Sequence, residues 1–415
     1  MPLSVIVPFR ALRPKREFVR EVSACPYDVL DWEEAKQLAR ANPLSFLRVE
    51  KSEIDLRKDR DVYGDEVYRK ARQNLDKLIR DGILVQDGKA CFYIYRQSVP
   101  GHTQYGIVGG VSTREYDAGL IKKHELTMPD KEEDRTRHID TVNAQTGLVF
   151  LVYRAQEAID RIVADAVKNE PVYDFSVEDG IGHTVWVIDD DRTIETIRRA
   201  FAEVECLYIA DGHHRAASAA AVARRRRDMD PGRKEAAEYE YFMAALFPHD
   251  QLRILDYNRV VKDLNGMSTA EFVERIREGF RVSEDFKDRS PVRFHEFGMY
   301  LRNGRWYRLT AKEKLYVGKN KIGRLDVSIL QDNILRPLLG IEDPRTDRRI
   351  RFVGGVRGMK ELERMVDSGH FAVAFSMYPP TVSQLMDIAD SGEIMPPKST
   401  WFEPKLRSGI FVHKL

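Results

Sequence analysis

Residues 206–216 read Cys-Leu-Tyr-Ile-Ala-Asp-Gly-His-His-Arg-Ala, and this stretch decides the fold. An apolar run enters a glycine turn, and an alanine-rich stretch over residues 216–223 follows. This order predicts a buried strand, a tight turn at Gly212 and a helix that begins at the two histidines. The start of a helix carries unpaired N–H groups and partial positive charge, so this turn is suited to bind phosphate.

The side chains of the turn add chemistry to its backbone. Two adjacent histidines, His213 and His214, seldom serve packing alone, although they could cap the helix or hydrogen-bond to nearby carbonyls. The planar guanidinium of Arg215 can bind two phosphate oxygens at once, which a lysine cannot do. We therefore expect a functional site at residues 211–215.

Two further clusters carry charged or hydroxyl groups. Residues 121–125, Ile-Lys-Lys-His-Glu, combine a carboxylate that can accept a hydroxyl proton with ammonium groups that can offset phosphate charge. Taken alone, this pentapeptide is more typical of an exposed charged turn. Residues 397–400, Pro-Lys-Ser-Thr, could hold an anionic or hydroxylated ligand, but alone they are more typical of a helix-entry loop capped by Ser399 or Thr400.

Size and composition limit the class of protein. A chain of 415 residues is long for one core, so we expect two lobes, residues 1–248 and 249–415. A net charge of +1 gives no bulk attraction to nucleic acid or anionic membranes, and we expect neither as a partner. We find no apolar stretch of membrane-spanning length and no signal-peptide pattern, and the three cysteines lie far apart. These features predict a cytoplasmic protein with reduced thiols and a small-molecule substrate.

Several common site motifs are missing from the sequence. It contains no Walker A sequence, no G-x-G-x-x-G, no G-x-S-x-G and no H-E-x-x-H. Because His213 and His214 are adjacent, they cannot easily bind one ion together, so we expect no metal held by the protein itself. Magnesium carried by substrate phosphates remains compatible with the sequence, since such sites need few protein ligands.

Periodicity and turn signals predict helices and strands in both lobes, which makes the fold class α+β. The charged residues 130–140 fit either a solvated helix or a phosphate-facing loop, and the solvated helix is favoured. The expected helices span residues 31–41, 66–81, 156–168, 193–203, 327–338 and 382–391, and the expected strands span residues 4–7, 90–97, 106–112, 146–153, 183–188, 206–209, 241–247, 293–300, 305–309 and 371–377.

In this order, the three clusters resemble the free-serine kinases of the ParB/sulfiredoxin-like fold. Those proteins carry Lys-x-His-Glu, then a strand running into Asp-Gly-His-His-Arg, then Pro-Lys-[Ser/Thr]-Thr preceded by a helix and Gly-Glu; here these are residues 122–125, 211–215 and 397–400, with 392–393 as Gly-Glu. Asp-Gly-His-His-Arg alone also occurs in ParB-type partitioning proteins, so the ordered triple is the more specific signal. The chain also looks like a member of a long bacterial and archaeal domain-of-unknown-function family with the same signature.

The resemblance implies a ParB/sulfiredoxin-like N-terminal lobe, a second mixed α/β lobe and a kinase that phosphorylates the hydroxyl of free L-serine or a similar metabolite. ATP, ADP or pyrophosphate would be the donor, with Mg2+. Glu125 would be the base. The implied catalytic residues are Glu125, His124 and Asp211, and the implied phosphate- and substrate-binding residues are Lys123, Gly212, His213, His214, Arg215, Lys398, Ser399 and Thr400.

The chain departs from these kinases in extra sequence at residues 1–90 and between Glu125 and Asp211, and in Trp401-Phe402 where they tend to have Arg-His. The alternative is a ParB-like nucleotide-binding regulatory or DNA-partitioning module, which the near-zero net charge disfavours. Sulfiredoxin-like chemistry would need a cysteine in the turn, where His213 stands.

Overall fold

A computed structural model describes residues 4–415 except 58–60, 178, 234–236 and 285. The chain divides into two compact units, Met1–Leu252 with Pro404–Leu415, and Arg253–Glu403. The sequence placed all residues from 249 onward in the second lobe, whereas the last twelve return to the first. They do so because strand β21 (His413–Lys414) pairs with β7 (Ala144–Gln145), and a further bridge joins Val412 to Leu12.

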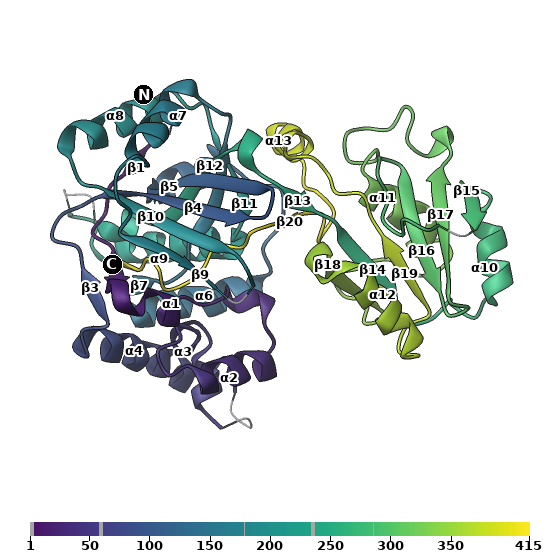
Figure 1. The fold of residues 1–415 in the computed structure, drawn as a ribbon, viewed down its shortest axis with the longest axis horizontal. Coiled ribbons are helices and arrows are strands. Elements are labelled where there is room, and N and C mark those ends of the chain that lie inside the picture. The colour runs from purple at the N-terminus through teal and green to yellow at the C-terminus, as the bar shows by residue number, and fades with distance from the viewer. Residues whose placement is uncertain (1–3, 58–60, 178, 234–236, 285) are drawn as a thin grey trace. The chain divides into compact units, whose positions relative to one another are not determined.

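A nine-stranded sheet, counted over the described residues, organises unit 1 in the order β6-β11-β8-β12-β5-β4-β10-β9, with β1 paired to β5 (Figure 1). Its strands are β1 (Ile6–Val7), β4 (Phe92–Val99), β5 (His102–Ser112), β6 (Ile121–Lys122), β8 (Val149–Tyr153), β9 (Tyr173–Ser176), β10 (Gly182–Ile188), β11 (Leu207–Asp211) and β12 (Tyr241–Pro248). The pairs β6·β11 and β8·β12 are parallel and the others antiparallel. Because β6 and β11 run in the same direction, the residues that follow these two strands lie at the same end of the sheet.

Helices pack against this sheet through small and apolar side chains. Helix α9 (His213–Met229) buries its alanines in the core that also contains Leu151 and Ile209 of the sheet. It lies beside α6 (Pro129–Val142), where the Ser218 hydroxyl donates to the Glu132 carbonyl at 2.9 Å. The other helices of unit 1 are α1 (Val19–Val22), α2 (Trp32–Ala41), α3 (Leu47–Glu50), α4 (Asp65–Arg80), α5 (Thr113–Asp117), α7 (Glu157–Ala166) and α8 (Asp191–Ala202). Helices α2 to α4 share a second apolar core with the short pair β2 (Leu12–Pro14) and β3 (Leu84–Gln86).

The charged residues 130–140 form part of helix α6, so the predicted helix is confirmed, but it is only partly solvated because Thr136, His138 and Ile139 are buried. The arginines near the end of α9, residues 224–227, form ion pairs with Asp117, Glu133, Asp140 and Glu240. Among the described residues, none of the helices is both long and apolar enough to span a bilayer.

Unit 2 is built on an antiparallel sheet in the order β15-β17-β16-β19-β14-β18. Its strands are β14 (Tyr257–Val261), β15 (Phe280–Glu284), β16 (Glu296–Leu301), β17 (Arg305–Ala311), β18 (Ile350–Gly354) and β19 (Val373–Ser376), and its helices are α10 (Thr269–Ile276), α11 (Asp326–Leu330), α12 (Gly358–Asp367) and α13 (Val382–Asp390). A separate pair joins β13 (Ile254–Leu255) to β20 (Trp401–Phe402). The helix predicted over 327–338 is shorter, because a π-helical turn over Gln331–Leu335 follows α11.

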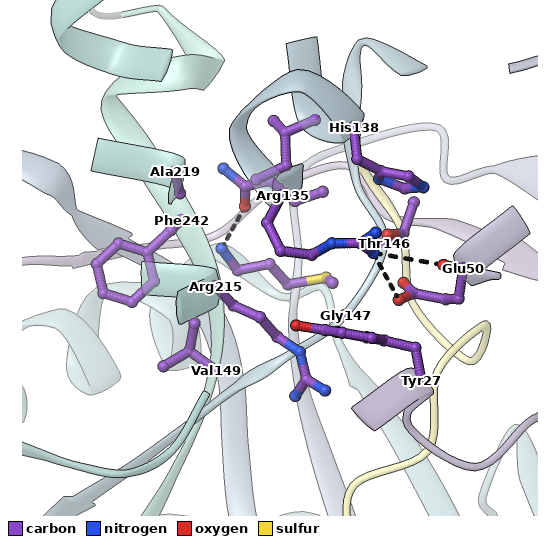
Figure 2. Close-up of a pocket in the computed structure, with 13 residues that line it drawn as sticks. Tyr27, Glu50, Arg135, His138, Thr146, Gly147, Val149, Arg215, Ala219 and Phe242 are labelled. Carbon is purple, nitrogen blue, oxygen red and sulfur yellow. Dashed lines mark hydrogen bonds and ion pairs between the residues drawn. The ribbon is translucent and has the colours of Figure 1, made fainter. Parts of the chain in front are cut away.

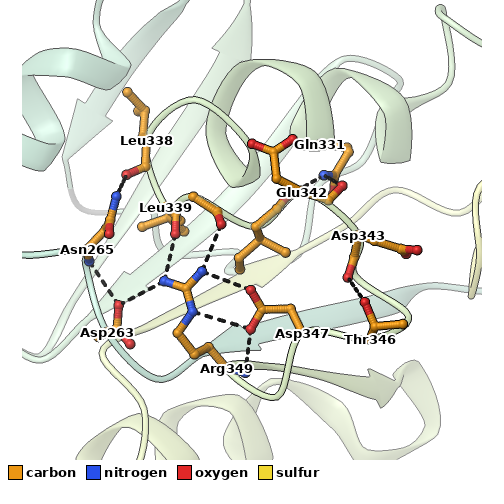
Figure 3. A network of polar contacts seen from close by, with 12 residues as sticks. Asp263, Asn265, Gln331, Leu338, Leu339, Glu342, Asp343, Thr346, Asp347 and Arg349 are labelled. Carbon is orange, nitrogen blue, oxygen red and sulfur yellow. Dashed lines mark hydrogen bonds and ion pairs between the residues drawn. The ribbon is translucent and has the colours of Figure 1, made fainter.

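One arginine holds several loops of unit 2 together (Figure 3). Arg349 donates to the carbonyls of Leu339 and Gly340, at 2.9 Å each, and to the Asp347 carboxylate at 2.8 Å. It also lies 3.4 Å from Asp263, just after β14. The guanidinium thus replaces regular secondary structure as the link between the segment after α11 and the edge of the sheet.

Candidate functional site

The predicted strand, glycine turn and helix are β11, Gly212 and α9. Gly212 has φ +88°, a left-handed conformation that favours glycine, while a Cβ there would make only an ordinary contact with the Cα of Val149 at 3.5 Å. Glycine offers no capping side chain, and no side chain caps α9. The predicted binding of phosphate by the N–H groups of this first turn stays a prediction.

The structure brings His124, Glu125 and His213 together at this turn. One nitrogen or carboxylate oxygen of each lies within 4.8 Å of those of the other two. The two imidazole rings meet edge to face, with centroids 4.6 Å apart. This proximity follows from the parallel pairing of β6 and β11, which brings residues more than 80 positions apart to one edge.

Both imidazoles are buried, with His124 2 % and His213 6 % exposed. Burial disfavours the charged form, so it lowers the pKa of His124 to about 4 and holds the pKa of His213 well below its usual value. His124 also donates a hydrogen bond to the carbonyl of Ile209. Both rings are therefore neutral near pH 7, and the second ring nitrogen of His124 carries a lone pair.

Asp211 forms an ion pair with Lys405, whose Nζ lies 3.1 Å from the carboxylate. Burial alone would raise the pKa of Asp211, but the Lys405 ammonium and the Arg215 guanidinium outweigh it and lower that pKa below its ordinary value. A carboxylate so strongly held as an anion is a weak base at neutral pH. Sequence reasoning missed Lys405, because nothing in the pattern of residues 404–415 indicates that they return to unit 1.

His214 and Arg215 face their own protein rather than the open turn. The Met128 N–H, at the start of α6, donates to Nε2 of His214 at 3.0 Å. Arg215 donates to the Leu148 carbonyl at 3.1 Å and lies 3.4 Å from Asp28. Two nitrogens of the Arg215 guanidinium thus have partners inside the unit, and its predicted binding of phosphate stays a prediction.

Arg215 lines a small cavity, shown in Figure 2 with Tyr27, Glu50 and Arg135 around it. The Tyr27 ring stacks against both guanidinium groups, 4.4 Å from Arg135 and 5.3 Å from Arg215. The cavity measures about 20 Å³, enough for one water molecule and far too small for a nucleotide. Sequence analysis did not single out Tyr27 or Glu50, because neither belongs to a motif. The only signal for Arg135 was the high charge density of residues 130–140.

The remaining predicted residues make contacts within their own units. The Lys123 Nζ sits 3.8 Å from the centroid of the Tyr116 ring, and burial lowers its pKa. Lys398, Ser399 and Thr400 belong to unit 2. The carbonyl of Lys398 accepts a hydrogen bond from Arg259 at 3.0 Å, and the buried Ser399 hydroxyl donates to the Pro396 carbonyl at 2.5 Å. The structure does not test the roles of any of these residues.

Comparison with known proteins gives a family but no activity. No curated protein matches the chain. Solved structures that align with 72 % of it include a conserved hypothetical protein from Pyrococcus furiosus (12 % identity, 92 % of that chain, TM-score 0.34), a free serine kinase in complex with AMP (13 %, 86 %, 0.34) and SbnI with C-terminal truncation from Staphylococcus aureus (12 %, 84 %, 0.37). Scores this low do not establish a shared fold. Residues 6–328 match the model of the family described as "Protein of unknown function (DUF1015)", and because the match spans most of its 415 residues the chain belongs to the DUF1015 family.

Proposed function

We propose that this chain transfers a phosphoryl group from ATP, ADP or pyrophosphate, accompanied by Mg2+, to the hydroxyl of free L-serine or a similar small metabolite. The observation that carries the proposal is the position of Glu125 beside the uncapped start of α9. A carboxylate that can take a hydroxyl proton and a group of N–H donors that can hold phosphate then share one place. The ParB/sulfiredoxin-like arrangement of unit 1 is part of this proposal.

Phosphoryl transfer suits such a site, because it depends on positioning and charge neutralisation more than on covalent chemistry. Lys405 holds Asp211 as an anion next to the turn. Mg2+ would be held mainly by the donor phosphates, with few ligands from the protein. Neither element requires a P-loop, which the sequence lacks.

The predicted part of Lys398, Ser399 and Thr400 in phosphate binding remains a proposal that rests on the motif resemblance. Lys398 carries it best, since its side chain is exposed. Lys398→Ala should slow transfer without changing thermal stability. An unchanged rate would limit the machinery to residues of unit 1.

The direct test incubates the purified full chain with Mg2+, each of the three donors, and L-serine, L-threonine, L-alanine or a polyol, followed by mass spectrometry. We expect phosphoserine, little phosphothreonine because its added methyl group must fit beside the attacking oxygen, and no product from alanine, which lacks a hydroxyl. Tight nucleotide binding without any phosphorylated product would instead favour the regulatory-module alternative.

A further inference from the structure

Three potential metal ligands converge at the turn, which sequence spacing did not reveal. The adjacent pair His213 and His214 cannot share an ion, but the fold pairs His213 with His124 instead, and Glu125 completes the group. Two imidazoles and a carboxylate on one side leave the remaining coordination positions open, the arrangement found in sites that bind a divalent transition metal.

The distances are close to what coordination needs. Ligands at about 2.0–2.2 Å from an ion lie roughly 3.0–3.5 Å from one another. The three donor atoms already lie within 4.8 Å, so small side-chain rotations would bring them onto one ion. The planes of the His124 and His213 rings meet at 85°, with centroids 4.6 Å apart.

The surroundings of His124 and His213 also favour a metal site, independently of the distances between the donor atoms. His124 donates one ring N–H to the Ile209 carbonyl, the second contact that a metal-binding histidine usually makes. Nε2 of His213 is buried and has no hydrogen-bond partner within the part of the chain that the structure describes. Leaving such an atom unpaired costs free energy, and a metal bond removes that cost.

We propose that His124, Glu125 and His213 form a binding site for a divalent transition metal ion such as Zn2+, distinct from the Mg2+ that accompanies a phosphate donor. The donor set discriminates between the two ions. Zn2+ accepts imidazole nitrogen readily, whereas Mg2+ prefers oxygen ligands in octahedral geometry.

Metal binding also has a consequence for catalytic activity. This consequence rests on the proposed function, whereas the metal site itself does not. A carboxylate of Glu125 bound to Zn2+ cannot at the same time accept the substrate proton. Zn2+ should therefore inhibit phosphoryl transfer at concentrations that fill the site, even with Mg2+ in excess.

The site is tested by titrating Zn2+ into untagged full-length protein by calorimetry, with neither donor nor acceptor present. We expect one equivalent to bind, and His213→Asn and Glu125→Gln each to weaken that binding by about tenfold or more. His370→Asn, a change at an exposed histidine of unit 2, is the matched control and should leave the affinity unchanged. Co2+ titrated in place of Zn2+ should give visible absorption bands of a nitrogen- and oxygen-ligated ion in the unchanged protein and not in His213→Asn.

Circular dichroism shows whether each variant is folded. If His213→Asn unfolds, Glu125→Gln decides the question, because Glu125 is only half-buried. Absence of Zn2+ binding, or equal binding by the unchanged protein and Glu125→Gln, would overturn the proposal. Since the titration involves no substrate, a failed metal site leaves the proposed kinase intact, and a failed kinase leaves the metal site intact.

Discussion

The start of α9 in unit 1 and the loop over residues 397–400 in unit 2 were singled out by the same motif resemblance, yet their polar groups are used differently. At α9, glycine leaves the helix uncapped and His213 keeps a buried nitrogen without a partner among the described residues. In the unit 2 loop, the Ser399 hydroxyl and the Lys398 carbonyl bond to neighbouring backbone and side chain. Helix α13, which precedes that loop, is closed by a capping box at Thr381.

This difference distinguishes residues whose polar groups stabilise the fold from residues whose polar groups can bind a ligand. A buried polar atom without a partner costs about 1–3 kcal/mol, so a fold that retains one has not optimised that place for stability. Where the hydroxyl or carbonyl already has a partner, binding a ligand must first break that bond. The contrast predicts that a change at Glu125, beside the start of α9, affects mainly activity, while a change at Ser399, whose hydroxyl already has a partner, affects mainly stability.

Glu125→Gln should have the largest effect. Removing the base should lower the rate of phosphoryl transfer by about 10²–10⁴-fold, while the half-buried side chain contributes little to folding. Initial rates by mass spectrometry and thermal melts by circular dichroism measure the two properties. A variant that transfers phosphate normally, or one that melts much earlier, would show that Glu125 is not the base.

Lys405→Met should cost unit 1 about 1–3 kcal/mol of unfolding free energy at pH 7, because it leaves the partly buried Asp211 carboxylate without its ammonium partner. The lowered pKa of Asp211 in the folded state contributes stability that is present above the usual carboxyl pKa and is lost as pH falls. The difference between the variant and the unchanged protein should therefore shrink below about pH 4. Lys414→Met, at an exposed lysine of the same segment, is the control for urea unfolding at both pH values.

Arg215→Lys should lower the unfolding free energy by about 1–2 kcal/mol, because a single ammonium nitrogen lacks the planar fork whose two separate nitrogens reach the Leu148 carbonyl and Asp28. Donor affinity, measured by calorimetry on the same variant, should change less than the stability does. Unchanged stability together with a large loss of donor affinity would show that the Arg215 guanidinium binds the donor phosphate, as the sequence predicted.

Local patterns predicted elements well where one segment contains its own signal. The helix expected over residues 31–41 is Trp32–Ala41, capped by Asp31, and the hairpin turn at residues 303–304 lies between β16 and β17. The meeting of His124 with His213, and of Lys405 with Asp211, depends on strand order and on the return of residues 404–415. The periodicity of a short stretch of sequence reveals neither the order of the strands nor the return of residues 404–415. These contacts could therefore not be derived from the sequence.

Two kinds of element escaped prediction for different reasons. Strands β15 and β18 each mix apolar residues with arginine within only five positions, too short a run to separate from loop. The predicted helix at 327–338 loses regular hydrogen bonding after Leu330, where Arg336 N–H bonds to the Gln331 carbonyl five residues back. A preference of residues for helix does not specify which hydrogen-bond spacing tertiary packing will select.

Glu115→Gln should reduce the pH dependence of stability by about 1–2 kcal/mol. Burial raises the pKa of Glu115 to about 7, although the Val5 N–H donates to its carboxyl at 2.9 Å. The folded protein therefore keeps a proton that the unfolded chain releases near pH 4.5, and stability falls as pH rises from about 5 to 8. Urea unfolding at pH 5.5 and 8 should show this fall in the unchanged protein and in Glu205→Gln, an exposed control, but not in Glu115→Gln.

Ser399→Ala should have the smallest effect. Removing the hydroxyl loses one hydrogen bond to the Pro396 carbonyl, worth about 0.5–1.5 kcal/mol of unfolding free energy for unit 2. Because that hydroxyl is buried and already has a partner, the KM for the phosphate donor should change less than about twofold, well below the effect of one lost charge-assisted bond. Steady-state kinetics and urea unfolding on one preparation separate the two effects. A raised KM with unchanged stability would show that the loop binds phosphate, and that its internal hydrogen bond opens when the donor arrives.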